Sequence, residues 1–272
     1  MKIPKYVALQ KAVGETPLSC AEAYRARHPE LIGVPLSYAG RLDPLASGAL
    51  LVLIGDECKQ QKKYHGLDKE YVIEVVIGIG SDTGDVMGRL SADASLSRTP
   101  KETDLTTIAR ELSGKMLSLP YPAFSSKTVH GKPLHTWACE GRLNEIEIPT
   151  QTAPLYEMKF LSMRTMPAAE LAETAIEKMN TIPPVEDARK ALGNDFRRGD
   201  IREDWKQFAL AKKDIPYTIA TFRVCAGSGM YMRTLANEIA KKFATNGLCL
   251  SIHRSKIGTL HHFLGISFFR KK

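Results

Sequence analysis

The stretch from Tyr38 to Gly55 constrains the fold more than any other part of the chain. Its first half holds turn-forming glycines and the pair Asp43-Pro44, and its second half, residues 49–54, is a continuous apolar run. A short apolar run bounded by glycines predicts a buried strand. Because a proline restricts the backbone of the residue before it, Asp43 is held in few orientations. Such a carboxylate suits a catalytic acid, base or nucleophile, and an Asp-Pro turn that only leads into the strand is the alternative.

The composition is that of an ordinary globular protein, with 43% hydrophobic and 25% charged residues in a chain of 272. No apolar run approaches the roughly 18 residues of a membrane span, and the N-terminus lacks the apolar core of a secretory signal. We therefore expect a cytoplasmic protein without membrane contact. The five cysteines are scattered without C-x-x-C spacing, which predicts neither disulfides nor a metal site.

The positive charge is concentrated near the C-terminus. Residues 216–272 hold nine basic residues and one acidic residue, which accounts for the whole net charge of +8. A basic segment on an otherwise neutral chain favours a polyanionic partner. Nucleic acid is favoured over membrane because no long basic amphipathic helix is visible. The alternative for residues 270–272 is a basic tail that serves solubility.

Hydrophobic periodicity places most of the remaining elements. Ser19 is predicted to cap a helix over residues 20–27. Strands are predicted over residues 69–80, 155–161, 217–225 and 249–258, and helices over 103–112 and 231–243.

Residues 164–215 interrupt this pattern. They are rich in charge and in helix-forming residues, above all over 168–179 and 185–192, which predicts a helical insertion. The insertion is either an RNA-contacting lobe, through its arginines, or a packing element.

Several motifs together resemble one family. The run from Gly40 to Gly48, Gly-Arg-Leu-Asp-Pro-Leu-Ala-Ser-Gly, followed by Gly-Asp-Glu-Cys-Lys over 55–59, resembles the active-site motif of the TruB family of RNA pseudouridine synthases. Three later segments resemble further motifs of that family in the same order, namely residues 68–72, 122–141 and 227–235. The loop Ser-Asp-Thr-Gly-Asp over 81–85 also has a counterpart in the family.

This resemblance implies an isomerase that needs no cofactor. It breaks the N1–C1′ bond of a uridine and rejoins the base through C5. Asp43 would attack C1′ or C6, or take a proton from the sugar. Arg233 would keep Asp43 ionised and aim it, and Tyr71 would stack against the target base. The uridine has to be flipped out of its stack, at a cost of roughly a few kcal/mol.

The resemblance also implies RNA contacts. Lys59 corresponds to a family lysine near the catalytic loop, while Lys127, His130 and Lys132 are candidate phosphate or base contacts. A solvated surface loop is the alternative for each of the latter three. Tyr38 stands where the bacterial tRNA enzymes carry a histidine that helps to hold the disrupted RNA loop, so the identity of the RNA stays open.

We therefore expect a mixed α/β (α+β) pseudouridine synthase fold, with a central, mainly antiparallel sheet, flanking helices and a catalytic cleft. The expected organisation is a monomer with one catalytic domain over residues 1–272, the helical insertion at about 164–215, and no C-terminal PUA domain. The expected substrate is uridine 55 in the T-loop of tRNA. The same reaction on another structured RNA, and a non-catalytic RNA-binding folding helper, are the alternatives.

Overall fold

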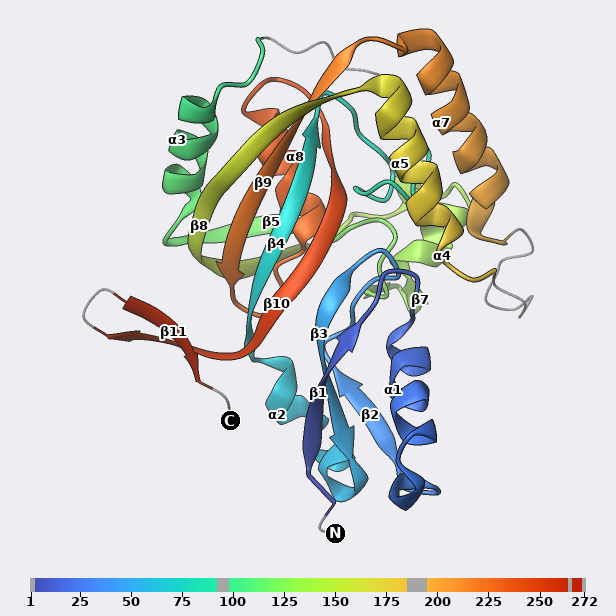
Figure 1. Cartoon of the computed structure of the whole chain (residues 1–272), viewed down its shortest axis with the longest axis vertical. Helices are drawn as coiled ribbons and strands as arrows, with labels where there is room; N and C mark the ends of the chain where they lie inside the picture. Colours follow the sequence, from blue (N-terminus) through green and yellow to red (C-terminus); the bar gives the residue numbers. More distant parts are fainter. Residues whose placement is uncertain (1–2, 92–97, 185–194, 264–265, 271–272) are drawn as a thin grey trace.

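A nine-stranded sheet runs through the computed structural model, which describes residues 3–91, 98–184, 195–263 and 266–270 (Figure 1). Its strand order is β1-β3-β10-β4-β9-β8-β5, with β2 paired to β3 and β11 paired to β10. Every pairing is antiparallel except that of β3 with β10. The predicted mixed α/β fold with a mainly antiparallel sheet is therefore confirmed.

The strands of this sheet are β1 (Tyr6–Lys11), β2 (Leu36–Ala39), β3 (Ser47–Ile54), β4 (Asp68–Ile77), β5 (Lys115–Pro120), β8 (Thr150–Pro167), β9 (Pro216–Ala226), β10 (Gly247–Phe263) and β11 (Ile266–Arg270). A separate two-stranded hairpin consists of β6 (Thr128–Val129) and β7 (Lys132–Pro133). The far end of β10 and β11 form an arm that projects from the body (Figure 1).

The helices are α1 (Pro17–Ala26), α2 (Gln61–His65), α3 (Glu102–Leu112), α4 (Leu134–Cys139), α5 (Ala168–Asn180), α7 (Arg198–Lys212) and α8 (Met232–Lys241). Short 3₁₀ turns are η1 (Pro29–Leu31), η2 (Gly55–Gln60), η3 (Leu143–Glu145) and η4 (Asp195–Arg197). No helix within the described ranges is long and apolar enough to cross a membrane.

Strand β3 carries the central motif, and seven of its eight residues are buried, as its apolar run predicts. Gly48 near its start has φ of +100°, and a Cβ there would lie 2.2 Å from the carbonyl oxygen of Arg254. Only glycine therefore lets β10 pass beside β3 at this point.

Two large hydrophobic cores, and a smaller third one between β3 and α2, cover different parts of the sheet. The larger core includes Leu105 of α3, Phe222 of β9 and Leu235 of α8. The second core joins Leu171 of α5 and Trp205 of α7 to strands β4, β9 and β10. The helices on the second core lie side by side (Figure 1).

One helix start differs from the prediction, and the insertion was predicted only in part. Helix α1 begins at Pro17, and Thr16 is its N-cap, whereas Ser19 sits three residues later and completes the capping box. In the predicted insertion, α5 matches the expected helix over 168–179, while the helix expected over 185–192 lies outside the described residues. Helix α7 was not delimited from sequence.

Candidate active site

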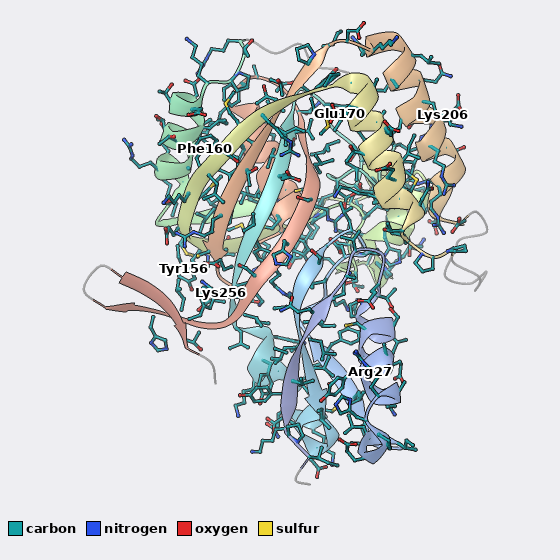
Figure 2. The ribbon with its side chains drawn as sticks, in the orientation of Figure 1. Arg27, Tyr156, Phe160, Glu170, Lys206 and Lys256 are labelled. Atoms are coloured by element: carbon teal, nitrogen blue, oxygen red, sulfur yellow. The ribbon has the colours of Figure 1, made fainter. Side chains whose placement is uncertain are left out.

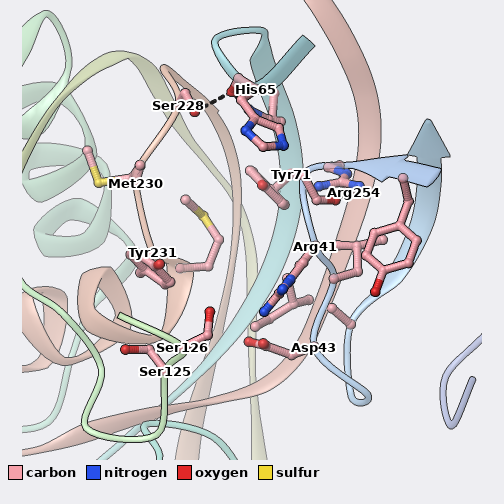
Figure 3. Close-up of a pocket in the computed structure, with 18 of the residues that line it drawn as sticks. Arg41, Asp43, His65, Tyr71, Ser125, Ser126, Ser228, Met230, Tyr231 and Arg254 are labelled. Carbon is pink, nitrogen blue, oxygen red and sulfur yellow. Dashed lines mark hydrogen bonds between the residues drawn. The ribbon is translucent and has the colours of Figure 1, made fainter. Parts of the chain in front are cut away.

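A cavity of about 780 Å³ lies between the β2–β3 loop, strand β4 and the turn that connects β9 to α8. This volume is typical of a ligand site, for which roughly 300–1,000 Å³ is usual. Figure 3 shows Arg41 and Asp43 on one side and Ser125, Ser126 and Tyr231 on the other, with His65, Tyr71 and Arg254 above them in the view. The cavity therefore gathers residues from segments that are far apart in the sequence.

Asp43 and Arg233 meet at the cavity, as the resemblance predicts. The Nε atom of Arg233 lies 2.9 Å from Oδ2 of Asp43, an ion-pair distance without hydrogen-bond geometry. The Arg233 side chain is 5% exposed and that of Asp43 is 44% exposed. The carboxylate is thus open to the cavity and is backed by a buried positive charge.

Arg233 is fixed by further contacts. Its Nη1 donates to the carbonyl of Thr83 at 2.8 Å, and its Nη2 donates to the carbonyl of Phe124 at 3.3 Å. A second carboxylate, Asp85, is buried with Oδ2 3.8 Å from the Arg233 Nε. Burial raises the pKa of Asp85, and the charge of Arg233 acts in the opposite direction. One guanidinium therefore faces an exposed and a buried carboxylate.

Hydrogen bonds hold the backbone of the loop that carries Asp43. Buried Arg254 binds the two ends of the loop, because it donates to the carbonyls of Gly40 (3.1 Å) and Ala49 (2.7 Å). Next to Asp43, the Pro44 carbonyl accepts from the Lys11 ammonium at 3.4 Å and from a backbone N–H at 3.0 Å. These donors hold the backbone on either side of the carboxylate.

Tyr71 and Tyr38 both line the cavity. Tyr71 lies on β4, and burial raises the pKa of its hydroxyl, so its ring stays a neutral phenol. Tyr38 lies on β2, where its side chain also packs against the larger core. Their predicted roles, stacking for Tyr71 and substrate contact for Tyr38, remain predictions.

The other four predicted contact residues lie outside the lining of this cavity. Lys59 is exposed on the η2 turn, with Nζ 2.7 Å from a carboxylate oxygen of Asp56. Lys132 Nζ is 2.7 Å from Glu140. Lys127 and His130 are exposed in the segment around β6 and β7. RNA contacts by these four residues remain predictions.

Sequence reasoning missed several residues that line the cavity. Arg41 lies inside the central motif but was not singled out, and no ion pair or hydrogen bond engages its guanidinium in the part of the chain that is described. His65 at the end of α2 and Lys69 on β4 also line the cavity. Of these residues, Arg41 could have been found from the sequence, because it lies in the central motif two positions before Asp43.

Five of the basic residues of the C-terminal segment form ion pairs with carboxylates of the protein itself. The paired cations are Arg223 with Glu157, Arg233 with Asp43, Lys241 with Glu238, Lys242 with Glu111, and Lys256, labelled in Figure 2, with Glu70. Lys241, Lys242 and Lys256 stay about half exposed in these pairs, with 47–55% of each side chain accessible, so contact of this segment with a polyanion remains a prediction.

Within the described ranges, no cluster of three or more histidine, cysteine, aspartate or glutamate side chains could hold a metal ion.

Replacing Lys69 with methionine is expected to change the pH dependence of stability. Burial lowers the pKa of Lys69 from 10.5 to about 8. Its contribution to the free energy of unfolding is complete above 10.5 and is lost as pH falls through 8, because the unfolded chain binds the proton more tightly. In urea unfolding, the stability of the wild type relative to the variant should rise between about pH 8 and about pH 10.5. Parallel profiles would contradict this, and Lys62→Met, at an exposed position, is the control.

The model of the TruB family pseudouridylate synthase N-terminal domain matches residues 35–179. The chain belongs to this TruB family. The matched range contains Asp43, Tyr71 and Asp85, and Arg233 lies beyond it.

Curated relatives of this TruB chain match most of its length. It is 26% identical over 239 residues to tRNA pseudouridine synthase 4 of Saccharomyces cerevisiae, covering 78% of this chain and 58% of that protein. It is 26% identical over 250 residues to tRNA pseudouridine synthase B of Caldicellulosiruptor saccharolyticus, covering 92% and 66% respectively. The chain thus spans less than two thirds of the length of these relatives.

A solved structure supports the fold. A chain from the crystal structure of a Cbf5-Nop10-Gar1 complex superposes on this protein with a TM-score of 0.50 at 14% identity. The match covers 93% of this protein and 48% of the solved chain. At this identity the likeness concerns the fold alone.

Proposed function

We propose that this protein is an RNA pseudouridine synthase in which Asp43 acts on a flipped-out uridine. The observation that carries the proposal is the Asp43 carboxylate, open to a ligand-sized cavity and 2.9 Å from the buried guanidinium of Arg233. Because the positive charge favours the ionised carboxylate, Asp43 is available for attack or for proton abstraction.

The reaction balances without a cofactor. The N1–C1′ bond of the uridine breaks, a C5–C1′ bond forms, and the hydrogen of C5 is replaced while N1 gains a proton. The protein has to stabilise the sugar while the base is detached and turned. A carboxylate at the cavity supplies the first requirement, and the ring of Tyr71 supplies an apolar face for the base.

We propose uridine 55 in the T-loop of tRNA as the substrate, because the two relatives above are named tRNA pseudouridine synthases. We further propose a monomer with one catalytic domain, in which α5 and α7 form an insertion. The five cysteines are free thiols, which supports a reducing cytoplasmic location.

Mapping pseudouridine in total RNA from cells with and without the gene tests this assignment. We expect one position to lose the modification, uridine 55 of several tRNAs. Loss of pseudouridine at a site in another structured RNA would contradict the proposed substrate and support the proposed reaction. An unchanged map would contradict the proposed function, and complementation with Asp43→Asn would then test a folding-helper role.

Replacing Arg41 with glutamine is expected to weaken RNA binding by roughly three- to tenfold and to lower the salt dependence by about one phosphate contact. The physical reason is that the Arg41 guanidinium faces the cavity without a carboxylate partner in the described chain. Filter binding of tRNA at several salt concentrations measures this. The matched control is Lys206→Gln on the outer side of α7 (Figure 2), which should leave the affinity unchanged.

A further inference from the structure

Helices α5 and α7 form a hairpin, hereafter the α5–α7 hairpin, whose apolar face is shared with the loops of the site. Its buried side chains include Leu171 of α5 and Trp205 of α7, and the same core contains Leu45 and Val86. Leu45 stands two positions after Asp43, and Val86 follows Asp85 directly. The hairpin therefore shares one apolar core with both the catalytic loop and the loop that anchors Arg233.

Polar contacts fix the second of these loops, residues 81–90, to α7. The indole Nε1 of Trp205 donates to the carbonyl of Val86 at 3.1 Å. The carboxylate of Asp204 accepts from Arg89 Nε at 2.6 Å and from the Leu90 N–H at 3.2 Å. The same loop supplies the Thr83 carbonyl that binds Arg233.

The N-terminal end of α7 also contacts Phe124, the second residue whose carbonyl binds Arg233. Arg197 pairs with Asp82 at 2.7 Å, and its guanidinium lies 4.4 Å from the ring centroid of Phe124. The carbonyl of Phe124 accepts from Arg233. Arg197 itself has φ of +63°, a left-handed conformation that non-glycine residues adopt only when the surroundings fix them.

The C-terminal end of α5 supports the loop that carries Asp43 through the turn at Gly14. Thr181 caps α5, and its carbonyl oxygen lies so close to Gly14 that a Cβ on Gly14 would be 2.3 Å away. Gly14, with φ of +88°, donates its N–H to the carbonyl of Pro44 at 3.0 Å. The hairpin thus reaches the residue next to Asp43 through a single glycine.

We infer that the α5–α7 hairpin is a positioning element that holds the Asp43–Arg233 pair in register for the reaction. This inference rests on the proposed function, and it adds which part of the chain sets the geometry of the pair. The contacts of the arginines in and next to the hairpin favour this positioning role over a role in binding RNA. Arg197, Arg198 and Arg202 all bond to groups of the protein itself.

The test is Trp205→Phe, which keeps most of the packing and removes the donor to Val86. At saturating RNA and at a temperature where both proteins are folded, the single-turnover rate should fall roughly 10- to 100-fold with RNA affinity unchanged, because small displacements of reacting groups have effects of that size. Amide hydrogen exchange should become faster over residues 81–90. Asp204→Asn, which opens no cavity, should act in the same direction, and Leu210→Ala, at a 78% exposed position of α7, should change nothing.

The outcomes separate the two proposals. Wild-type rate and wild-type exchange in both Trp205→Phe and Asp204→Asn would overturn the positioning role, and so would a rate loss without faster exchange over 81–90. A drop in thermal midpoint with an unchanged rate per folded molecule would show a merely structural hairpin. If the wild type itself makes no pseudouridine, the proposed function fails, and the exchange measurement still decides whether the hairpin holds these loops.

Discussion

Replacing Asp43 with asparagine is expected to slow pseudouridine formation by roughly 10⁴-fold, the scale of loss when an essential nucleophile or base is removed. Asparagine has nearly the same shape, but it is neutral and neither attacks the uridine nor accepts its proton. Because the side chain is 44% exposed at the cavity, the fold should be unaffected. RNA affinity should also be retained, since Arg41 and Tyr71 are unchanged.

Nucleoside analysis of RNA digested after a single-turnover reaction measures this loss. Asp56→Asn is the matched control, because Asp56 lies on the same segment of chain at an exposed position outside the cavity. A variant at position 43 that retains more than a small fraction of the wild-type rate would remove Asp43 from the chemistry. Equal loss in the control would point to a general effect of the substitution.

Replacing Arg233 with methionine is expected to abolish activity and also to destabilise the fold by about 3–5 kcal/mol, the usual cost of breaking a buried ion pair from one side. The variant leaves the buried carboxylate of Asp85 without its counter-charge. It also leaves the carbonyls of Thr83 and Phe124 without their donors. Urea unfolding measures the stability, and Arg110→Met, at an exposed position of α3, is the control.

The stability deficit of Arg233→Met should shrink at acid pH. Burial raises the pKa of Asp85 above its ordinary value of 3.8, and loss of Arg233 should raise it further. A group with a raised pKa holds its proton more tightly in the folded protein. Its contribution to stability is therefore present at low pH and is lost as pH rises from 3.8 through the folded pKa. A deficit that stays constant or grows on acidification would contradict the burial of an unpaired carboxylate at Asp85.

The sheet was predictable from the sequence because its strands have distinctive patterns. The apolar run that became β3 and the alternation that became β4 each needed burial on at least one face, and the helix α8 followed from Leu235 and Ile239 on one side. The start of α1 was misplaced because two candidate caps, Thr16 and Ser19, occur three residues apart and both take part in the capping box.

The site was only partly predictable. The meeting of Asp43 with Arg233 came from the family motifs, since no periodicity links residues so far apart in the chain. Asp85 stayed hidden because burial beside a guanidinium is a tertiary property. The ion pairs of the C-terminal cations stayed hidden for the same reason: a sequence gives the number of cations, whereas their carboxylate partners come from other strands.

The insertion over residues 164–215 was also only partly predictable from the sequence. Its helix formers were evident, but the sequence left open whether the arginines face RNA or the protein. The structure has Arg197 against Asp82 and Arg202 against Asn180, so these side chains serve packing and anchoring. Helix α7 was not delimited because its apolar positions, such as Trp205, are separated by many charged residues.

The most direct test of the central claim is release of tritium from a tRNA transcript labelled at C5 of its uridines, since forming the C5–C1′ bond expels the hydrogen of C5. With the wild-type protein we predict release of one equivalent per tRNA, none from a transcript with cytidine at position 55, and none with Asp43→Asn. Release by Asp43→Asn at the wild-type rate, or no release from any uridine by the wild type, would contradict the account.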